Sequence, residues 1–264
     1  MDDTGLFAPL PWQGIGLTDT GLVRTSNQDA FVVENQIGLW VVADGMGGHA
    51  GGSVASQLAV QSVVEHVRAS RELWPNSFEQ EKSVFTFLEK AVAEGDEAIR
   101  RQATTTPDLT GMGTTLVVAL LLHGPPIQIA IAHVGDSRAY QIRNQTIRAL
   151  TADHSLVQKL LTEGRISQKE AQIHPQQNVL LKALGAEDRA VPDIELHSFE
   201  PQDILLLCTD GLTKTVAEQE ILSTVLEMKH SPLMACQQLI DRANAAGGKD
   251  NTTVVLITPH SFSR

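Results

Sequence analysis

Short runs of apolar and β-branched residues recur along this 264-residue chain, and helical segments separate them in pairs. This pattern limits the possible folds more than any other feature of the sequence. The runs are bounded by Gly, Asn, Asp or Pro and predict strands at residues 30–33, 39–43, 115–122, 127–134, 138–142, 204–208 and 252–258. Because these strands follow one another in hairpin-like order, they favour antiparallel sheets over a repeated βαβ unit.

Two pairs of amphipathic segments are expected to cover these sheets. Residues 52–72 place Ala55, Ala59 and Val63 on one helical face, and residues 79–103 have the same apolar period. A second pair is predicted at residues 216–227 and 232–246. The expected fold class is therefore α/β (α+β), with antiparallel sheets flanked by pairs of helices.

The length of the chain favours one domain over two, because a single hydrophobic core can extend to about 250–300 residues. Residues 151–184 interrupt the strand pattern and are interpreted as a partly helical surface flap. The first residues lack the basic and apolar regions of a signal peptide, and no run reaches the ~20 apolar residues of a membrane span. We therefore expect a cytoplasmic protein without membrane contact.

The charge of the chain argues against one class of partner. The formal net charge is -11 and no segment is rich in Lys or Arg, so the sequence lacks the basic surface typical of nucleic-acid binding. An excess of carboxylates fits a cation site but is equally typical of a soluble protein. The two cysteines, Cys208 and Cys236, have no zinc-site spacing.

Four aspartates stand at predicted strand ends beside Gly or Asn: Asp44, Asp136, Asp210 and Asp250. Each one alone is more often part of an ordinary turn. Together they could deliver several oxygen ligands to one place, as Mg²⁺ or Mn²⁺ requires. The glycine-rich segment 44–52 contains neither the GK[ST] ending nor the GxGxxG pattern of a nucleotide-binding loop, and we interpret it as close packing around a charged site.

Seven motifs in chain order carry a family resemblance. They are RTSNQDAF (24–31), VVADGMGGH (41–49), GTT (113–115), HVGDSR (133–138), LTADHS (150–155), CTDGL (208–212) and DNTT (250–253). In this order they resemble the type 2C (PPM) metal-dependent protein serine/threonine phosphatases of the compact bacterial type. The resemblance implies one catalytic domain over residues 1–264, with its core at about 14–258, folded as a four-layer αββα sandwich with a metal cleft at one end near the flap.

The resemblance also implies a set of metal ligands. Asp44 would bridge two cations, the Gly45 carbonyl would bind one of them, and Asp210 and Asp250 would bind the other. Asp136 would join Asp210 at a third, weaker metal site. Asp44 and Asp210 therefore carry both metal-binding and catalytic roles in this hypothesis.

Other positions are assigned by the same resemblance. Arg24 would hold the substrate phosphate through its paired donors, and Asp29 would order water bound to the metals. Met46 stands where animal members carry a histidine that protonates the leaving group. His49 is a candidate substitute for that histidine, with a structural role at a helix start as the alternative. Gln28 replaces a glutamate of many relatives.

The reaction implied is hydrolysis of phosphoserine and phosphothreonine by direct attack of a water held between two Mn²⁺ or Mg²⁺ ions. The implied partners are phosphorylated proteins made by a serine/threonine kinase, and a monomer is expected. Two alternatives stay open: a catalytically weak phosphoprotein-binding scaffold and a phosphatase for small phosphorylated metabolites. The intact ligand positions argue against the first, and an open cleft beside a flap argues against the second.

Overall fold

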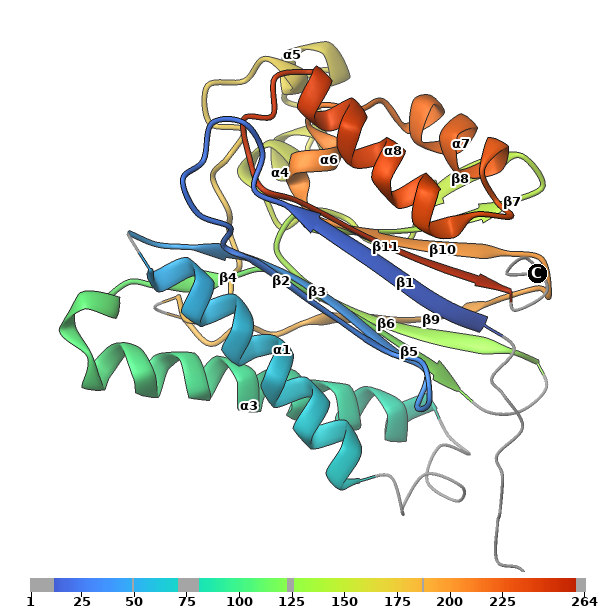
Figure 1. Ribbon diagram of the computed structural model, residues 1–264. Coiled ribbons are helices and arrows are strands. Elements are labelled where there is room, and N and C mark those ends of the chain that lie inside the picture. Colours follow the sequence, from blue (N-terminus) through green and yellow to red (C-terminus); the bar gives the residue numbers. More distant parts are fainter. Residues whose placement is uncertain (1–11, 49, 71–80, 123–125, 187, 260–264) are drawn as a thin grey trace, which may run out of the picture.

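The computed structural model describes residues 12–48, 50–70, 81–122, 126–186 and 188–259. In this part of the chain, eleven strands form two antiparallel sheets, and helices cover the outer face of each sheet (Figure 1). The predicted four-layer αββα sandwich is confirmed.

One sheet has five strands in the order β1-β11-β10-β7-β8. In chain order they are β1 (Trp12–Asp19), β7 (Arg138–Arg143), β8 (Thr146–Ala149), β10 (Ile204–Cys208) and β11 (Thr252–Pro259). All residues of β11 are buried, because it lies between β1 and β10 and is covered on both faces. Its β-branched run Thr252–Pro259 suits such a position.

The other sheet has the strand order β2-β3-β5-β6-β9, with β4 paired to β3 beside this path. The strands are β2 (Asp29–Glu34), β3 (Leu39–Met46), β4 (Gly113–Thr114), β5 (Leu116–Leu122), β6 (Gln128–Val134) and β9 (Asp193–Ser198). β2 and β3 pair in a register that sets Asp29 opposite Asp44. Two carboxylates from different strands are thereby brought together at one end of the sheet.

Long helices cover the outer face of each sheet (Figure 1). The six-stranded sheet packs against α1 (Gly51–Ala69) and α3 (Glu81–Thr105), and the five-stranded sheet against α7 (Glu218–Glu227) and α8 (Pro232–Ala245). The shorter helices are η2 (Pro107–Leu109), α4 (Leu156–Thr162), α5 (Gln168–Gln172) and α6 (Asp210–Thr213). None of the helices in the described ranges has the length and apolar character to cross a membrane.

Three apolar cores hold the four layers together. The central core lies between the sheets and includes Trp12, Trp40, Val117, Leu205 and Ile257, all buried. The other two cores lie between each sheet and its helices, where the predicted face of α1 packs through Ala55, Ala59, Val63 and Val67. Burial of these apolar faces is the main favourable contribution to stability.

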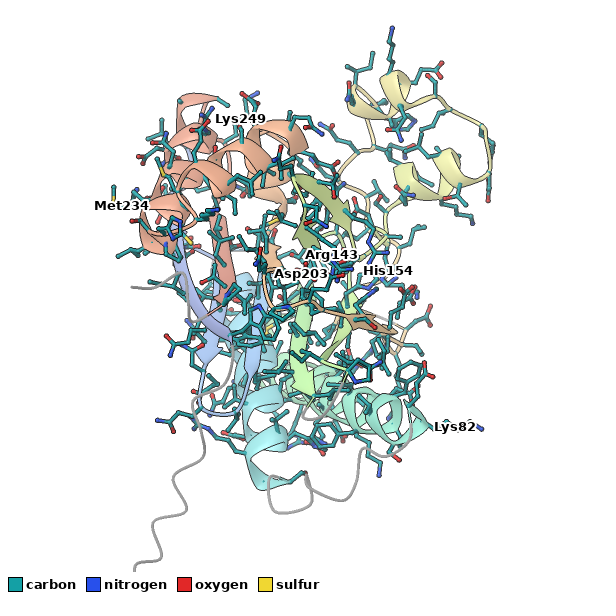
Figure 2. All side chains as sticks on the ribbon, turned by 90° about the vertical axis from the view of Figure 1, so that its right-hand side faces the viewer. Lys82, Arg143, His154, Asp203, Met234 and Lys249 are labelled. Carbon is teal, nitrogen blue, oxygen red and sulfur yellow. The ribbon has the colours of Figure 1, made fainter. Side chains whose placement is uncertain are left out.

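The flap segment (residues 151–184) contains α4 and α5, which project from the sandwich in Figure 2. Its first residues are fixed to β7, where Arg138 donates two hydrogen bonds to Asp153, at 2.7 and 2.8 Å. Its last residues pair with β4 through a bridge between Thr114 and Leu184. Both ends of the segment are therefore attached next to strands of the sandwich.

Six of the seven predicted strands agree with the structure within one residue at each end, and β3 runs three residues further than expected. Helices α7 and α8 agree within two residues. The predicted helices 52–72 and 79–103 correspond to α1 (Gly51–Ala69) and α3 (Glu81–Thr105). Residues 71–72 and 79–80 of these predictions lie outside the described residues.

Four strands were not predicted: β1, β4, β8 and β9. β1 carries Gly14 and Gly16, which weaken the strand signal. A Cβ on Gly14 would lie 2.3 Å from Trp40 Nε1, and one on Gly16 would lie 2.6 Å from Phe31 Cε2. The glycines are therefore required by aromatic rings that pack across the strand, which a local pattern cannot reveal.

Candidate metal centre

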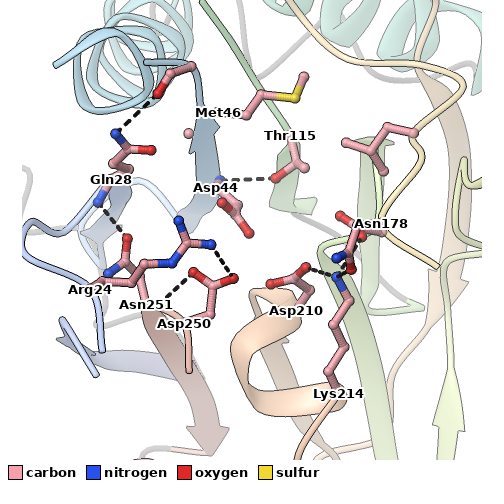
Figure 3. Close-up of a pocket in the computed structure, with 14 residues that line it drawn as sticks. Arg24, Gln28, Asp44, Met46, Thr115, Asn178, Asp210, Lys214, Asp250 and Asn251 are labelled. Carbon is pink, nitrogen blue, oxygen red and sulfur yellow. Dashed lines mark hydrogen bonds and ion pairs between the residues drawn. The ribbon is translucent and has the colours of Figure 1, made fainter. Parts of the chain in front are cut away.

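A pocket of about 250 Å³ opens where the end of β3, the turn after β6, helix α6 and the start of β11 meet (Figure 3). These segments are distant in sequence and come from both sheets. The pocket lining includes six of the predicted site residues: Arg24, Asp44, Gly45, Asp136, Asp210 and Asp250. The structure therefore brings the predicted ligand positions to one place.

The sequence predicted that Asp44 follows the end of a strand. In the structure, Asp44 lies inside strand β3, which continues to Met46. The strand continues because β4 pairs with Gly45 and Met46. The Asp44 backbone N–H donates to Thr115 Oγ1 at 2.9 Å, and its carbonyl accepts the Thr114 hydroxyl at 2.9 Å. These contacts fix the backbone on both sides of the carboxylate.

The buried carboxylates raise one another's pKa values. Burial, followed by the charges of Asp210 and Asp29, raises the pKa of Asp44 well above its usual range. Burial and then the charge of Asp210 raise the pKa of Asp136 to about 7. Carboxylates in this position are stable as anions at neutral pH only when cations offset their charge.

Asp29 lies behind the pocket and is held from the five-stranded sheet. Its Oδ2 accepts hydrogen bonds from Thr209 Oγ1 at 2.9 Å and Thr253 Oγ1 at 2.6 Å. These bonds lower the pKa of Asp29, but burial has the larger effect and raises it to about 7. Its Oδ1 is buried without a hydrogen-bond partner, which leaves one oxygen for a water or an ion.

Two basic side chains contact the carboxylates of the pocket. Arg24 Nη2 donates to Asp250 Oδ2 at 2.9 Å, and the Arg24 side chain is half exposed at the rim. Lys214 Nζ donates to Asp210 Oδ2 and lies 3.8 Å from Asp136 Oδ2. Burial lowers the pKa of Lys214, but the charges of the nearby aspartates outweigh burial and raise it. Figure 3 shows the side chains of Arg24 and Lys214 beside these carboxylates.

Close backbone approaches fix the glycines beside the aspartates. A Cβ on Gly45 would lie 2.0 Å from the Gly52 carbonyl oxygen, and one on Gly211 would lie 2.0 Å from the Asn251 carbonyl oxygen. Real Cβ atoms do not tolerate such distances, so the backbone packing around the pocket requires glycine at both positions.

The donors that line the pocket include carboxylate and carbonyl oxygens, which divalent cations such as Mg²⁺ and Mn²⁺ prefer. Among the described residues, no three His, Cys, Asp or Glu side chains form a group that could hold an ion by side chains alone. Mg²⁺ usually needs only one or two carboxylates, with backbone carbonyls and waters as further ligands. Asp210 Oδ1, like Asp29 Oδ1, is buried without a partner. The site therefore fits cations that retain water ligands and does not fit a cage made of side chains.

Three residues that organise the pocket had no predicted role: Asn251, Lys214 and Asn178. Asn251 Oδ1 accepts the Gln28 backbone N–H at 2.8 Å, and its Nδ2 donates to the carbonyls of Thr20 and Ser26. Asn251 thereby joins the loop that carries Arg24 to the start of β11. Lys214 and Asn178 also line the pocket. The i,i+4 spacing of Asp210 and Lys214 could have indicated their contact, whereas the contact between Lys214 and Asn178 depends on the fold and had no signal in the sequence.

Three further positions had been singled out near the site. Met46 and Gln28 line the pocket, and Gln28 Nε2 donates to the Gly47 carbonyl at 3.4 Å. His49 lies outside the described residues, so its role stays a prediction.

Comparisons with known proteins agree on one family. The profile of "Protein phosphatase 2C" matches residues 23–246. The "Serine/threonine phosphatase stp" of Listeria welshimeri is 42% identical over 243 residues, covering 91% of this chain and 93% of that protein.

Solved structures give the same result. The catalytic domain of the serine/threonine phosphatase PstP, solved in complex with 2 manganese ions, has a TM-score of 0.79 at 33% identity, covering 94% of this chain and 97% of that one. Stp1 from Staphylococcus aureus has a TM-score of 0.82 at 33% identity, covering 93% and 94%. With its profile match, its relatives and its fold in agreement, the chain belongs to the protein phosphatase 2C family.

Proposed function

We propose that this chain is a metal-dependent protein serine/threonine phosphatase that hydrolyses phosphoserine and phosphothreonine with water. The observation that carries the proposal is the pocket in which Asp44, Asp136, Asp210 and Asp250 converge, with Arg24 at its rim. Relatives named as serine/threonine phosphatases support it.

In this proposal, Asp44, the Gly45 carbonyl, Asp210 and Asp250 hold two divalent cations. Mn²⁺ and Mg²⁺ both suit such oxygen ligands, and the manganese ions in the related PstP structure support Mn²⁺. Cations bound at such a site lower the pKa of water and offset negative charge on the phosphoryl group.

The remaining residues bind and orient. Arg24 binds the phosphate oxygens of the substrate through its guanidinium donors, of which Nη2 now contacts Asp250. In the proposed complex, a metal ion would take the place of Arg24 beside Asp250, and the substrate phosphate would take the place of Asp250 beside Arg24. Asp29, whose Oδ1 has no hydrogen-bond partner, accepts a hydrogen bond from the attacking water and orients it.

The proposal extends to the biological setting of the enzyme. Residues 1–264 act as one catalytic domain, with the flap segment beside the pocket on the substrate side. The substrates are proteins phosphorylated by a serine/threonine kinase in the cytoplasm, where the ATP required for phosphorylation is present. The enzyme acts as a monomer in this proposal.

Hydrolysis of a phosphothreonine peptide by the purified chain tests this function. We expect turnover with Mn²⁺, none with EDTA, and a loss of about 1,000-fold or more in Asp44→Asn, because several kcal/mol of transition-state stabilisation depend on the bound metals. Failure to hydrolyse peptides and phosphoproteins with either metal would favour a binding scaffold. Turnover confined to small phosphate esters would favour a metabolite phosphatase.

A further inference from the structure

Lys214 occupies the space between two carboxylates of the pocket. It follows Asp210 by four residues, so the turn of α6 brings both side chains to the same side. Its Nζ donates to Asp210 Oδ2, lies 3.8 Å from Asp136 Oδ2 and donates to Asn178 Oδ1 at 2.7 Å (Figure 3). One ammonium group thus contacts α6, the turn after β6 and the flap segment.

This placement differs from that of an ordinary surface lysine. The Lys214 side chain is 34% exposed, and the side chains of Asp136 and Asp210 are 9% and 11% exposed. Asn178 supplies a neutral oxygen from a third direction. A cation surrounded by two anionic oxygens and one neutral oxygen is the environment that a metal ion would also require.

A lysine ammonium and a divalent cation cannot share this position. A Mg²⁺ ion needs carboxylate oxygens at about 2.1 Å, and the oxygen of Asp210 that faces this space already accepts a hydrogen bond from Lys214. Two cations at such short separation also repel each other strongly in a partly buried site. Occupation by one therefore excludes the other.

We propose that the Lys214 ammonium takes the place of a third divalent cation between Asp136 and Asp210, so that this chain binds two metal ions and no third. The inference rests on the proposed function, which assigns the two ions to Asp44, Gly45, Asp210 and Asp250. Through Asn178, the same ammonium also links the flap segment to the metal centre. The competing account is that Lys214 swings into solvent when metal is added.

The number of Mn²⁺ ions bound per chain distinguishes these accounts, and isothermal titration calorimetry measures it without a substrate. The full chain is compared with Lys214→Met, which keeps the length of the side chain and removes its charge. We expect Lys214→Met to bind one more Mn²⁺ ion per chain than the wild type. Adding Asp136→Asn to Lys214→Met should remove that extra ion.

The single variant Asp136→Asn gives an independent test that does not depend on how Lys214→Met folds. Its Mn²⁺ stoichiometry should equal that of the wild type, because Asp136 faces lysine and not metal in the native chain. Loss of one ion in Asp136→Asn would overturn the inference, as would an unchanged stoichiometry in Lys214→Met.

The same titrations separate this inference from the proposed function. If the wild type binds Mn²⁺ through Asp44 but Lys214→Met gains no ion, only the role of Lys214 is wrong. If neither protein binds Mn²⁺, the proposed function is wrong and the inference falls with it.

Discussion

Arg24 offers the sharpest test at the scale of single residues. Its guanidinium is half exposed at the rim and contacts only the carboxylate of Asp250 among the contacts described. Arg24→Lys keeps the charge but removes the planar pair of donors that suits a phosphate. A hydrogen bond to a charged group contributes about 1.5–3 kcal/mol, so we expect kcat/KM for a phosphopeptide to fall about tenfold to a hundredfold.

Arg68→Lys is the matched control for this substitution. Arg68 is similarly exposed and forms an ion pair with Glu34 at 2.7 Å, on α1 and away from the pocket. Exposed ion pairs contribute little to stability, so Arg68→Lys should leave kcat/KM unchanged. Equal kinetics for Arg24→Lys and the wild type would remove Arg24 from the phosphate site.

The metal-centre aspartates were predictable from the sequence, whereas the contact between Lys214 and Asp136 was not. Asp44, Asp136, Asp210 and Asp250 could be predicted to converge, because each has a strand or turn signal and a motif around it. They do lie in one pocket, while their roles as ligands stay predictions. Lys214 could not be found in this way, because its contact with Asp136 joins positions 78 residues apart by sequence number and depends on two turns of the fold.

The connection between β3 and α1 can be tested at the scale of elements. Gly45→Ala would push a methyl group to 2.0 Å from the Gly52 carbonyl oxygen, so the strand and the helix start must move apart. Overpacking of this kind costs about 1–3 kcal/mol, and we expect a lower free energy of unfolding together with weaker Mn²⁺ binding. Chemical denaturation and calorimetry measure the two effects.

Gly48→Ala is the control within the same glycine-rich segment. A Cβ at Gly48 meets no atom within 4 Å, and its φ lies outside the left-handed region. We therefore expect almost no change in stability or in Mn²⁺ affinity. If both alanine variants behave alike, the close approach at Gly45 is not what fixes this connection.

The strands that were predicted correctly are those whose local apolar pattern matches their burial in the fold. The apolar runs of β5, β6, β10 and β11 were located within one residue, because these strands are buried and read as continuous apolar segments. β8 was missed because its hairpin turn uses Asn144 and Gln145 at positive φ without the usual glycine. β9 (DIELHS) is a short edge strand whose alternation of polar and apolar residues is a strand signal that was missed. Only Ile194 and Leu196 are apolar, and Asp and Glu have low strand propensity.

At the scale of the whole molecule, the excess of acidic residues meets the metal centre. The net charge of -11 is distributed so that several carboxylates are buried in one pocket, where burial and mutual repulsion raise the pKa values of Asp29 and Asp136 to about 7. The fold thus holds carboxylates that are unstable as anions unless a cation is near. Metal binding and folding stability should therefore be linked.

The direction of this linkage follows from the pKa values. Asp29 and Asp136 have ordinary pKa values near 3.8 in the unfolded chain and about 7 in the metal-free fold. Between these values the folded protein binds more protons than the unfolded chain, so stability falls as pH rises from about 4 to about 7. His133, His154 and His197 have lowered pKa values because of burial, and they act in the opposite direction below about pH 6.5.

Asp136→Asn isolates the carboxylate contribution from that of the histidines. In EDTA, we expect the Tm of Asp136→Asn relative to the wild type to increase as pH rises from about 5 to 8, because the variant has no charge to bury at this position. Added Mn²⁺ should raise the Tm of the wild type more at pH 8 than at pH 5, since the ions then bind carboxylates that have lost their protons. Differential scanning calorimetry at both pH values, with and without Mn²⁺, measures each difference. Parallel pH profiles of the two metal-free proteins would mean that Asp136 keeps an ordinary pKa in the fold, with Lys214 offsetting its burial in full.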